Sequence, residues 1–257
     1  MSTPRISIIM AAYNAASFIH EAVMSVILQS YTNWELLIIN DGSADGTEEV
    51  VTKIQDTRIR YFKQNNAGVS SARNQGLINM SGEYFCFLDA DDSLPPNSLE
   101  LRISKFEQSP NLTFVDGIVS IRDQTMKSET GRFVPECSGY IFDRLVRLDS
   151  CCFFGPSWMI KREPDRLYRM PEGLTHAEDL CFYLSLAEDR LYDHVDEPVY
   201  WYRKGHASAM KNVIGLERGY RYYYSYAKSL GASERDLKYL KQRVRRILFL
   251  SYLFDAN

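Results

Sequence analysis

Three carboxylates stand within four residues, at Asp89, Asp91 and Asp92, directly after the short apolar run of residues 84–88. Turn-forming residues flank that run on both sides, which predicts a buried strand that ends abruptly in acid. Crowded carboxylates repel one another at neutral pH, so they need protons or a cation between them. A divalent metal with oxygen ligands meets that need, and such metals often carry a phosphorylated substrate. The acids therefore predict a metal site at the end of a strand.

Two other interpretations fit the same acids. The oxygen donors from residue 89 to residue 100 partly match the ligand spacing of a calcium-binding EF-hand loop. That loop needs glycine at its sixth position, where this chain has Leu94, and an entering helix, where a strand is predicted. The remaining alternative is a solvated acidic surface without a ligand.

Strands alternate with helices in the part of the chain that precedes these acids. The predicted strands are 6–11, 34–39, 58–62 and 84–88, and the predicted helices are 18–29, 47–53 and 69–80. Such alternation favours right-handed crossovers and a mainly parallel sheet flanked by helices, which is an α/β fold.

The second half of the chain alternates less clearly. We expect helices over 97–107, 174–190 and 214–230, a strand over 195–203 and an irregular excursion over 123–137. No internal repeat or low-complexity linker separates the halves, so we expect the second half to extend the same domain.

Polar residues follow three of the predicted strands. Tyr13 and Asn14 follow the first strand, Asp41 lies in an Asn-Asp-Gly-Ser sequence after the second, and the acids follow the fourth. Ligands of parallel α/β sheets bind beyond the carboxyl ends of the strands. The convergence favours a binding site at this edge, although the sequence around Asp41 is also ordinary turn chemistry.

Four further residues could serve such a site. Arg73 lies near the start of a predicted helix, where a cation is unfavourable, so it could serve an anion or a base. Gly68 just before it would let a ligand approach the backbone. Asp179 could act as a general base or simply favour a helix N-terminus. His206 is a lone histidine in a predicted loop, which is more often ordinary than functional.

Composition excludes some classes of protein. The net charge of −3 gives no reason to expect nucleic acid as a partner. The five cysteines are odd in number and show no metal-ligand spacing, which favours free thiols in a reducing, cytoplasmic compartment. Dinucleotide-binding, Walker A and Gly-x-Ser-x-Gly motifs are missing, which weakens dehydrogenase, NTPase and esterase interpretations.

Membrane targeting has one candidate segment. The N-terminus lacks the pattern of a signal peptide, and no stretch approaches the ~20 apolar residues that span a membrane. Residues 234–254 form a basic, aromatic, amphipathic helix pattern, which fits either a core-packed helix or contact with the inner face of a membrane. The pattern still runs near residue 257, so we expect the natural chain to continue.

Four segments of this chain resemble the family-2 glycosyltransferases. They are 6–14 (ISIIMAAYN), 38–47 (IINDGSADGT), 66–74 (NAGVSSARN) and 82–92 (GEYFCFLDADD). Beyond residue 105 the resemblance is thinner and depends on Glu178-Asp179 and on the segment 202–208. The resemblance implies a GT-A (Rossmann-like) fold with residues 1–210 as the catalytic domain and 211–257 as a helical extension. Within that domain, 1–105 would bind the nucleotide and 106–210 the acceptor.

The resemblance also implies inverting transfer from a nucleotide sugar, and it assigns roles to single residues. Tyr13 and Asp41 would hold the base and ribose, with Arg73 near the uracil and Gly68 beside the ligand. Ala11 stands where some relatives have a hydroxyl residue, so its contact would come from the backbone.

The remaining roles concern the metal and the proton. Asp89 would face the ribose or the metal, Asp91 would bind Mn2+ or Mg2+ on the diphosphate, and Asp92 would support the loop. Asp179 would be the catalytic base. His206 resembles a C-terminal histidine that reaches the metal or phosphates in many GT-A enzymes.

The predicted partners are a UDP- or dTDP-sugar donor and a carbohydrate or lipid-linked glycan acceptor. Two alternatives remain: a sugar-1-phosphate nucleotidyltransferase, and a non-catalytic module that binds nucleotide sugars. The first normally opens with a glycine-rich basic loop, which is absent near Tyr13. The second would bind UDP without turning over any acceptor. The tyrosine-rich segment 220–226 could line an acceptor site, but we expect it to pack.

Overall fold

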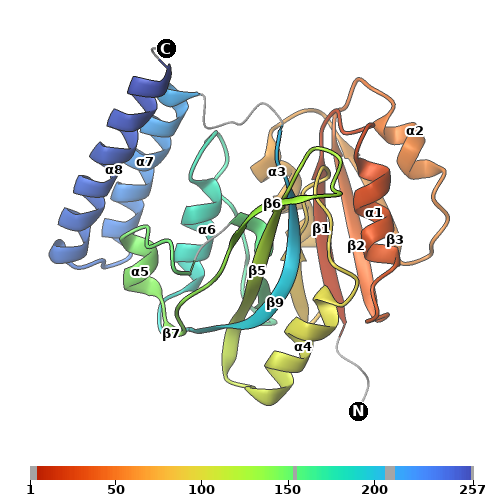
Figure 1. Cartoon of the computed structure of the whole chain (residues 1–257), viewed down its shortest axis with the longest axis horizontal. Coiled ribbons are helices and arrows are strands. Elements are labelled where there is room, and N and C mark those ends of the chain that lie inside the picture. Colours follow the sequence, from red (N-terminus) through yellow and green to blue (C-terminus); the bar gives the residue numbers. More distant parts are fainter. Residues whose placement is uncertain (1–4, 153–154, 206–211, 256–257) are drawn as a thin grey trace.

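The computed structural model describes residues 5–152, 155–205 and 212–255. Within these residues one nine-stranded sheet has the order β3-β2-β1-β4-β8-β5-β9-β7, and β6 pairs with β5. The strands are β1 (Ile6–Ala12), β2 (Trp34–Asp41), β3 (Ile59–Gln64), β4 (Tyr84–Phe87), β5 (Leu112–Arg122), β6 (Glu129–Phe133), β7 (Gly139–Tyr140), β8 (Met159–Lys161) and β9 (Leu191–Arg203). Figure 1 shows the sheet with helices on both sides.

Eight α-helices accompany the sheet in the described part of the chain. They are α1 (Ile19–Ile27), α2 (Thr47–Thr52), α3 (Val69–Asn79), α4 (Ser98–Gln108), α5 (Phe142–Val146), α6 (Glu178–Leu186), α7 (Val213–Ser229) and α8 (Glu234–Asp255). The helices and strands predicted in the first half are therefore confirmed, with small shifts at their ends.

The sheet is mainly parallel, as expected. Strands β1 to β4 run parallel to one another. Strand β8 lies between β4 and β5 and is antiparallel to both. Strand β5 and its parallel partner β9 therefore run in the same direction as β1 to β4. The carboxyl ends of these six strands therefore lie at one edge of the sheet.

Two expectations for the second half are wrong. The irregular excursion over 123–137 contains β6, whose backbone pairs with the end of β5. The predicted helix over 174–190 is shorter, since α6 begins at Glu178 and ends at Leu186. Strand β6 is polar and at least partly exposed along its length, so its sequence shows no alternation of apolar and polar residues that would predict a strand. Its strand conformation depends on pairing with β5.

The sheet separates two hydrophobic cores. Helices α1, α2 and α4 cover one face, where apolar side chains such as Ile8, Val23 and Ile103 are buried. Helices α3, α5 and α6 cover the other face, which is rich in aromatic side chains such as Phe87 and Phe182. Helices α7 and α8 pack on α6 and α5 and add side chains to the same core. Both faces are covered, so the inner strands are apolar on both sides.

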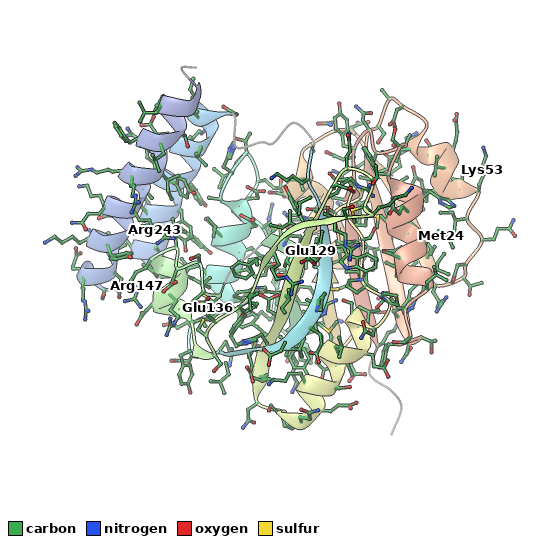
Figure 2. The ribbon with its side chains drawn as sticks, viewed as in Figure 1. Met24, Lys53, Glu129, Glu136, Arg147 and Arg243 are labelled. Carbon is green, nitrogen blue, oxygen red and sulfur yellow. The ribbon has the colours of Figure 1, made fainter. Side chains whose placement is uncertain are left out.

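Helices α7 and α8 form the helical extension at one end of the molecule (Figure 1). The Tyr223 hydroxyl of α7 donates to the Leu145 carbonyl of α5 at 2.7 Å. Arg147, labelled beside α5 in Figure 2, reaches α8, where its Nη1 lies 3.5 Å from Asp236. No helix among the described residues is long and apolar enough to cross a membrane.

Helix α3 lies unusually close to the sheet at Gly76. A Cβ added there would lie 2.3 Å from Cγ2 of Ile9 and 3.2 Å from Cδ1 of Ile39. Glycine therefore sets the height of α3 above β1 and β2, and with it the position of every side chain that α3 presents at the edge of the sheet.

We predict that Gly76→Ala destabilises the protein by about 1 to 3 kcal/mol, because the added methyl group overpacks a close helix–sheet contact. The measurement is the free energy of unfolding in urea. The control is Gly46→Ala, where the nearest atom to an added Cβ is 3.4 Å away on the side chain of Glu49. Equal stability of the two variants would contradict the packing argument.

Candidate active site

A cleft of about 370 Å3 opens at the carboxyl edge of the sheet. The ends of β1 and β4 and the first turns of α1 and α3 line it. Five of the residues predicted from the sequence are among the lining residues: Ala11, Tyr13, Arg73, Asp89 and Asp91. The others are Asn14, Ala15, Phe18, Val69 and Ala90. The structure thus brings together residues from three distant segments.

The loop after β1 is fixed against the loop after β2. The Asn14 amide donates to the Ser43 hydroxyl at 3.0 Å, and the Asn14 side chain accepts from the Ala44 amide at 2.9 Å. The Ala16 amide donates to the Asp45 carboxylate at 3.0 Å. These bonds hold Tyr13 at the rim of the cleft, where its ring is 55% exposed and available for stacking.

Asp41 and Gly68 are not among the residues that line the cleft. The buried carboxylate of Asp41 accepts from the amides of Ala67 at 2.9 Å and Gly68 at 2.8 Å. It also accepts from Nε2 of Gln64 at 2.7 Å. Gly68 has φ +92°, a conformation that favours glycine, and α3 begins at the next residue. Asp41 therefore shapes the loop that leads into α3.

Arg73 and Asp89 form an ion pair on the floor of the cleft. The two side chains meet at 2.6 Å, with the Arg73 guanidinium almost buried and Asp89 one-third exposed. Burial opposes the charge of Arg73, but the Asp89 carboxylate outweighs it and raises the pKa of Arg73. Arg73 thus places a permanent positive charge beside the predicted acids.

Asp92 supports the acidic loop from below. Its carboxylate accepts from the Tyr200 hydroxyl at 2.9 Å and from the Arg203 amide at 2.7 Å. The Arg203 side chain donates to the Asp91 carbonyl at 2.6 Å and to Glu21 at 2.7 Å. Burial, followed by the neighbouring charges of Asp89 and Asp91, raises the pKa of Asp92. Arg203 has no catalytic motif in the sequence, and only its place within the segment 202–208 hinted at a role.

The donor chemistry at the loop fits a hard divalent cation. Both oxygens of Asp92 are hydrogen-bonded within the protein, and Asp89 is paired with Arg73. Asp89 and Asp91 both line the cleft. Carboxylate oxygens are the ligands that Mg2+ and Mn2+ prefer. Predicted ligand His206 lies outside the described residues.

Glu178 and Asp179 begin α6, close enough to the cleft to interact with its charges. Burial raises the pKa of Asp179, Arg73 opposes that rise and Asp89 adds to it. Burial and then Asp179 raise the pKa of Glu178 to about 7. One oxygen of Glu178 is buried without a hydrogen-bond partner among the described residues. The electrostatics therefore join α6 to the pair of Arg73 and Asp89.

The start of α6 is held in a strained and crowded conformation. Ala177, directly before the two acids, has φ 64°, which is unfavourable for a residue with a Cβ. Gly219 of α7 packs against His176, the residue before Ala177. A Cβ added at Gly219 would lie only 2.4 Å from the carbonyl oxygen of His176. Helix α7 thus packs tightly against the segment that leads into α6, and no pattern in the sequence predicted this contact.

Asn74 joins the two halves of the site. Its side-chain amide accepts from the Met170 amide at 2.7 Å and donates to the Met170 carbonyl at 3.0 Å. It also donates to the Glu172 carboxylate at 2.8 Å. Because Asn74 follows Arg73 on α3, the segment that leads into α6 is tied to the helix that carries the buried arginine.

Solved structures with the same architecture identify the fold. A mannosyltransferase from Pyrobaculum calidifontis, in complex with GDP-Man and Mn2+, aligns with a TM-score of 0.70 over 98% of this chain and 74% of its own, at 18% identity. TarS of S. aureus (residues 1–349), in complex with UDP-GlcNAc, aligns with a TM-score of 0.68 over 86% of this chain and 66% of its own, at 20% identity. The fold is that of the GT-A glycosyltransferases.

Sequence comparison gives the family. The family model described as "Glycosyl transferase family 2" matches residues 7–168, and the chain belongs to that family. An uncharacterized glycosyltransferase of Rickettsia felis is 31% identical over 199 residues, which are 75% of this chain. The match covers 32% of the Rickettsia protein, so the chain spans about a third of that relative's length.

A second relative has a described activity. It is the UDP-Glc:alpha-D-GlcNAc-diphosphoundecaprenol beta-1,3-glucosyltransferase of Escherichia coli, which is 33% identical over 185 residues. The match covers 72% of this chain and 70% of the relative. The family-2 resemblance predicted from the four segments is therefore confirmed.

The raised pKa of Glu178 has a consequence for stability. A folded-state pKa of about 7 lies above the ordinary glutamate pKa of 4.5, so the folded protein binds more protons than the unfolded chain between pH 4.5 and pH 7. Stability should therefore fall as pH rises from 4.5 to 7, and then level off. We predict that Glu178→Gln removes much of this slope and is more stable than wild type at pH 8, by on the order of 1 to 3 kcal/mol.

Urea unfolding at intervals from pH 4.5 to pH 8 measures the effect. The control is Glu197→Gln, because Glu197 is exposed on β9. A Glu178→Gln variant that keeps the wild-type slope would show that Glu178 ionises normally.

Proposed function

We propose that this protein is an inverting, metal-dependent glycosyltransferase that moves a hexosyl group from a UDP- or dTDP-sugar to a hydroxyl of a glycan or lipid-linked acceptor. One observation carries the proposal. Asp179, from far along the sequence, interacts electrostatically with Arg73 and Asp89, which line the cleft together with Asp91. Such a site has acids for a metal, a cation for a nucleotide and a separate acid for a proton.

The donor would occupy the cleft. Tyr13 at the rim offers a ring for the base, and Ala11 offers its backbone and a small side chain at the end of β1. Asp41 would act through the loop that it holds at Gly68, with Arg73 and Asp89 nearer to the ribose or uracil. In this scheme residues 1–105 bind the donor, 106–210 bind the acceptor and 211–257 form the extension.

Asp91 would hold Mn2+ or Mg2+ on the diphosphate, with His206 as a further ligand. A metal bound there would stabilise the negative charge of the departing nucleoside diphosphate. The presence of Mn2+ in the complex of the mannosyltransferase supports a metal of this kind.

Asp179 would be the general base. The acceptor hydroxyl must lose its proton as it attacks the anomeric carbon, and a carboxylate can take that proton. The raised pKa of Asp179 makes its carboxylate a better proton acceptor than a solvated aspartate. A single displacement with base and leaving group on opposite faces of the sugar inverts the anomeric centre, as in inverting glycosidases.

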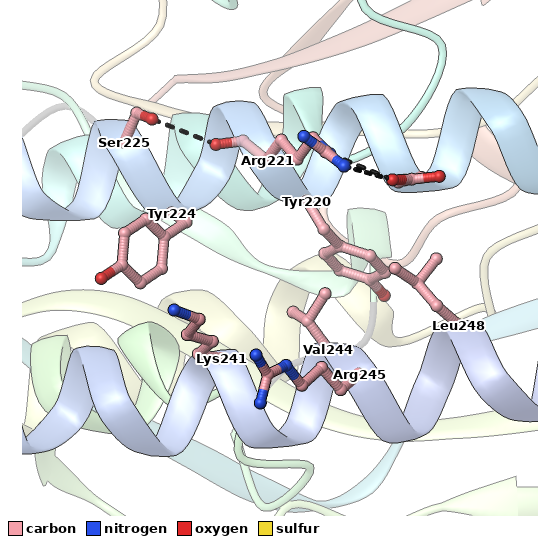
Figure 3. A pocket seen from close by; sticks show the side chains of 9 residues that line it. Tyr220, Arg221, Tyr224, Ser225, Lys241, Val244, Arg245 and Leu248 are labelled. Carbon is pink, nitrogen blue, oxygen red and sulfur yellow. Dashed lines mark hydrogen bonds and ion pairs between the residues drawn. The ribbon is translucent and has the colours of Figure 1, made fainter.

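Besides the acceptor-binding part at 106–210, the C-terminal extension would help to hold a long acceptor. A groove of about 500 Å3 lies between α7 and α8, and Figure 3 shows Tyr220 and Tyr224 on one wall with Lys241 and Arg245 on the other. Aromatic rings stack on sugars and basic groups bind phosphate. The Escherichia coli relative is named for a diphosphoundecaprenol acceptor, which supports an acceptor of this chemistry. Of the tyrosine-rich segment, Tyr223 is buried and packs as expected.

Helix α8 would also contact the inner face of a membrane. Its exposed side chains include five basic residues and five large apolar or aromatic ones. They are Arg235, Lys238, Lys241, Arg245 and Arg246, and Tyr239, Phe249, Leu250, Tyr252 and Leu253. A helix surface that is basic and aromatic complements anionic lipid headgroups and the acyl boundary.

We predict that Asp179→Asn lowers kcat by about 100- to 10,000-fold, because the amide cannot accept the acceptor proton. Asp91→Asn should lower transfer and abolish its dependence on added Mn2+. The measurements are release of UDP from UDP-sugar with a lipid-linked or oligosaccharide acceptor, and far-UV circular dichroism to confirm the fold. Donors are first screened by thermal shift with Mn2+, and dTDP- and GDP-sugars are included.

Asp196→Asn is the matched control, since the Asp196 side chain is 91% exposed. Near-normal turnover by Asp179→Asn would refute the base assignment, and metal-independent transfer by the wild type would refute the role of Asp91. Release of pyrophosphate from an NTP and a sugar phosphate would identify a nucleotidyltransferase instead. Binding of UDP with Mn2+ but no turnover would identify a binding module.

The membrane contact has its own test. Arg246→Glu should weaken binding to vesicles with anionic lipids by about tenfold or more, because each basic residue near such a surface contributes about 1 kcal/mol. Lys53→Glu makes the same charge change on α2, far from α8 (Figure 2), and should have a small effect. Co-sedimentation measures both. Equal binding by the two variants, or no binding of the wild type, would contradict the contact.

A further inference from the structure

Three cysteines from two separate loops meet at the aromatic-rich core on the α6 side of the sheet. Cys137 precedes β7, whereas Cys151 and Cys152 follow α5. Their Sγ atoms all lie within 4.8 Å of one another. Cys137 and Cys152 are buried and Cys151 is half-buried. The spacing of these cysteines matches no metal motif, so only the fold reveals the cluster.

The two loops meet backbone to backbone at this point. The Glu136 amide donates to the Cys151 carbonyl at 2.9 Å, and the Cys137 thiol approaches the same carbonyl at 3.5 Å. Cys137 and Cys151 have their Sγ atoms 2.9 Å apart, longer than the ~2.05 Å of a disulfide, and all five cysteines are free thiols. Backbone contacts thus hold the three thiols in place.

A carboxylate and a cation complete the surroundings. Asp149 accepts from the Cys151 amide at 3.1 Å and is also a hydrogen-bond partner of the Cys151 thiol. Arg144 donates to Cys151 Sγ at 3.2 Å and lies 3.6 Å from the Asp149 carboxylate. Three sulfurs and a carboxylate oxygen are a ligand set that zinc accepts in a tetrahedral site.

We propose that Cys137, Cys151 and Cys152 bind one zinc ion as thiolates, and that the Asp149 side chain, which is not part of the 4.8 Å cluster of ligand atoms, rotates to supply the fourth ligand. Zinc lies ~2.3 Å from each thiolate sulfur, so the sulfurs of a tetrahedral site lie about 3.8 Å apart. The three sulfurs here already lie within 4.8 Å of one another, so small side-chain movements would bring them to that spacing. Binding releases the three thiol protons and leaves a site with two net negative charges. The Arg144 guanidinium offsets one of them. A disulfide between Cys137 and Cys151 would involve only two of the three clustered thiols, whereas a zinc ion would also bind Cys152 and Asp149.

Zinc at this place would act as a structural clamp. It would join the loop before β7 to the loop after α5, since these loops carry the ligands. Leu148 and Asp149 of the second loop also line a pocket of about 200 Å3 together with Leu180 and Tyr220. Leu180 follows Asp179, so the clamp would steady one wall beside the start of α6.

The test uses the full chain, expressed with zinc in the medium and purified without chelators. Mass spectrometry of metals should find one zinc per chain. Replacement by Co2+ should give the sulfur-to-cobalt charge-transfer absorption of a thiolate site. A strong chelator should lower Tm of the wild type, because a metal bound only by the folded state stabilises it.

Cys137→Ser and Cys151→Ser should lose the zinc and the cobalt absorption, and the chelator should leave their Tm unchanged. The control is Cys86→Ser, which changes a buried cysteine of β4 outside the cluster and should retain both. A wild-type protein without zinc, or without cobalt charge-transfer absorption, overturns the proposal even if the variants unfold. Loss of two thiols in a titration of the purified protein would show a disulfide and also overturn it.

Discussion

The buried carboxyl group of Asp92 is the constraint on which the acidic loop depends. A carboxylate without water around it is tolerated only when hydrogen bonds replace the water, and Tyr200 and Arg203 of β9 provide them. These two residues lie more than a hundred positions away in the sequence. The loop that presents Asp89 and Asp91 is consequently stable only after the second half of the chain has joined the sheet.

The same logic extends across the cleft. Arg73 forms an ion pair with Asp89, which follows β4, on the floor of the cleft. The positive charge of Arg73 also interacts with the carboxylate of Asp179 in α6. Asn74 fixes the approach to α6 by bonding both backbone groups of Met170. Two neighbouring residues of α3 thus have different roles: Arg73 offsets the charge of the acids, and Asn74 binds the segment that leads into α6. Gly76 allows α3 to pack close to the sheet, which places both side chains at the site.

The sequence predicted the first half of the fold well because its strands are short, apolar and separated by turn residues. It placed Tyr13, Asp89 and Asp91 together because carboxyl ends of parallel strands must converge. Arg73 was indicated by its place near a helix start, and Ala11 only by the family resemblance. The sequence could not predict that the Asp41 carboxylate accepts hydrogen bonds from the amides of Ala67 and Gly68, since those partners depend on the fold. Strand β6 and the cysteine cluster were also hidden, because both depend on partners brought together by long-range pairing.

The contact between Gly219 and His176 has a consequence for how relatives of this protein can be recombined. The C-terminal helices look like a separable unit, which would make them attractive for exchange between enzymes in order to graft new acceptor preferences. Yet α7 touches the backbone directly before α6, with no room for a side chain at residue 219. A chimaera whose incoming helix lacks glycine at this position would shift the strained turn at Ala177. Compatibility at one glycine would therefore limit modular exchange more than the many contacts along the helix faces.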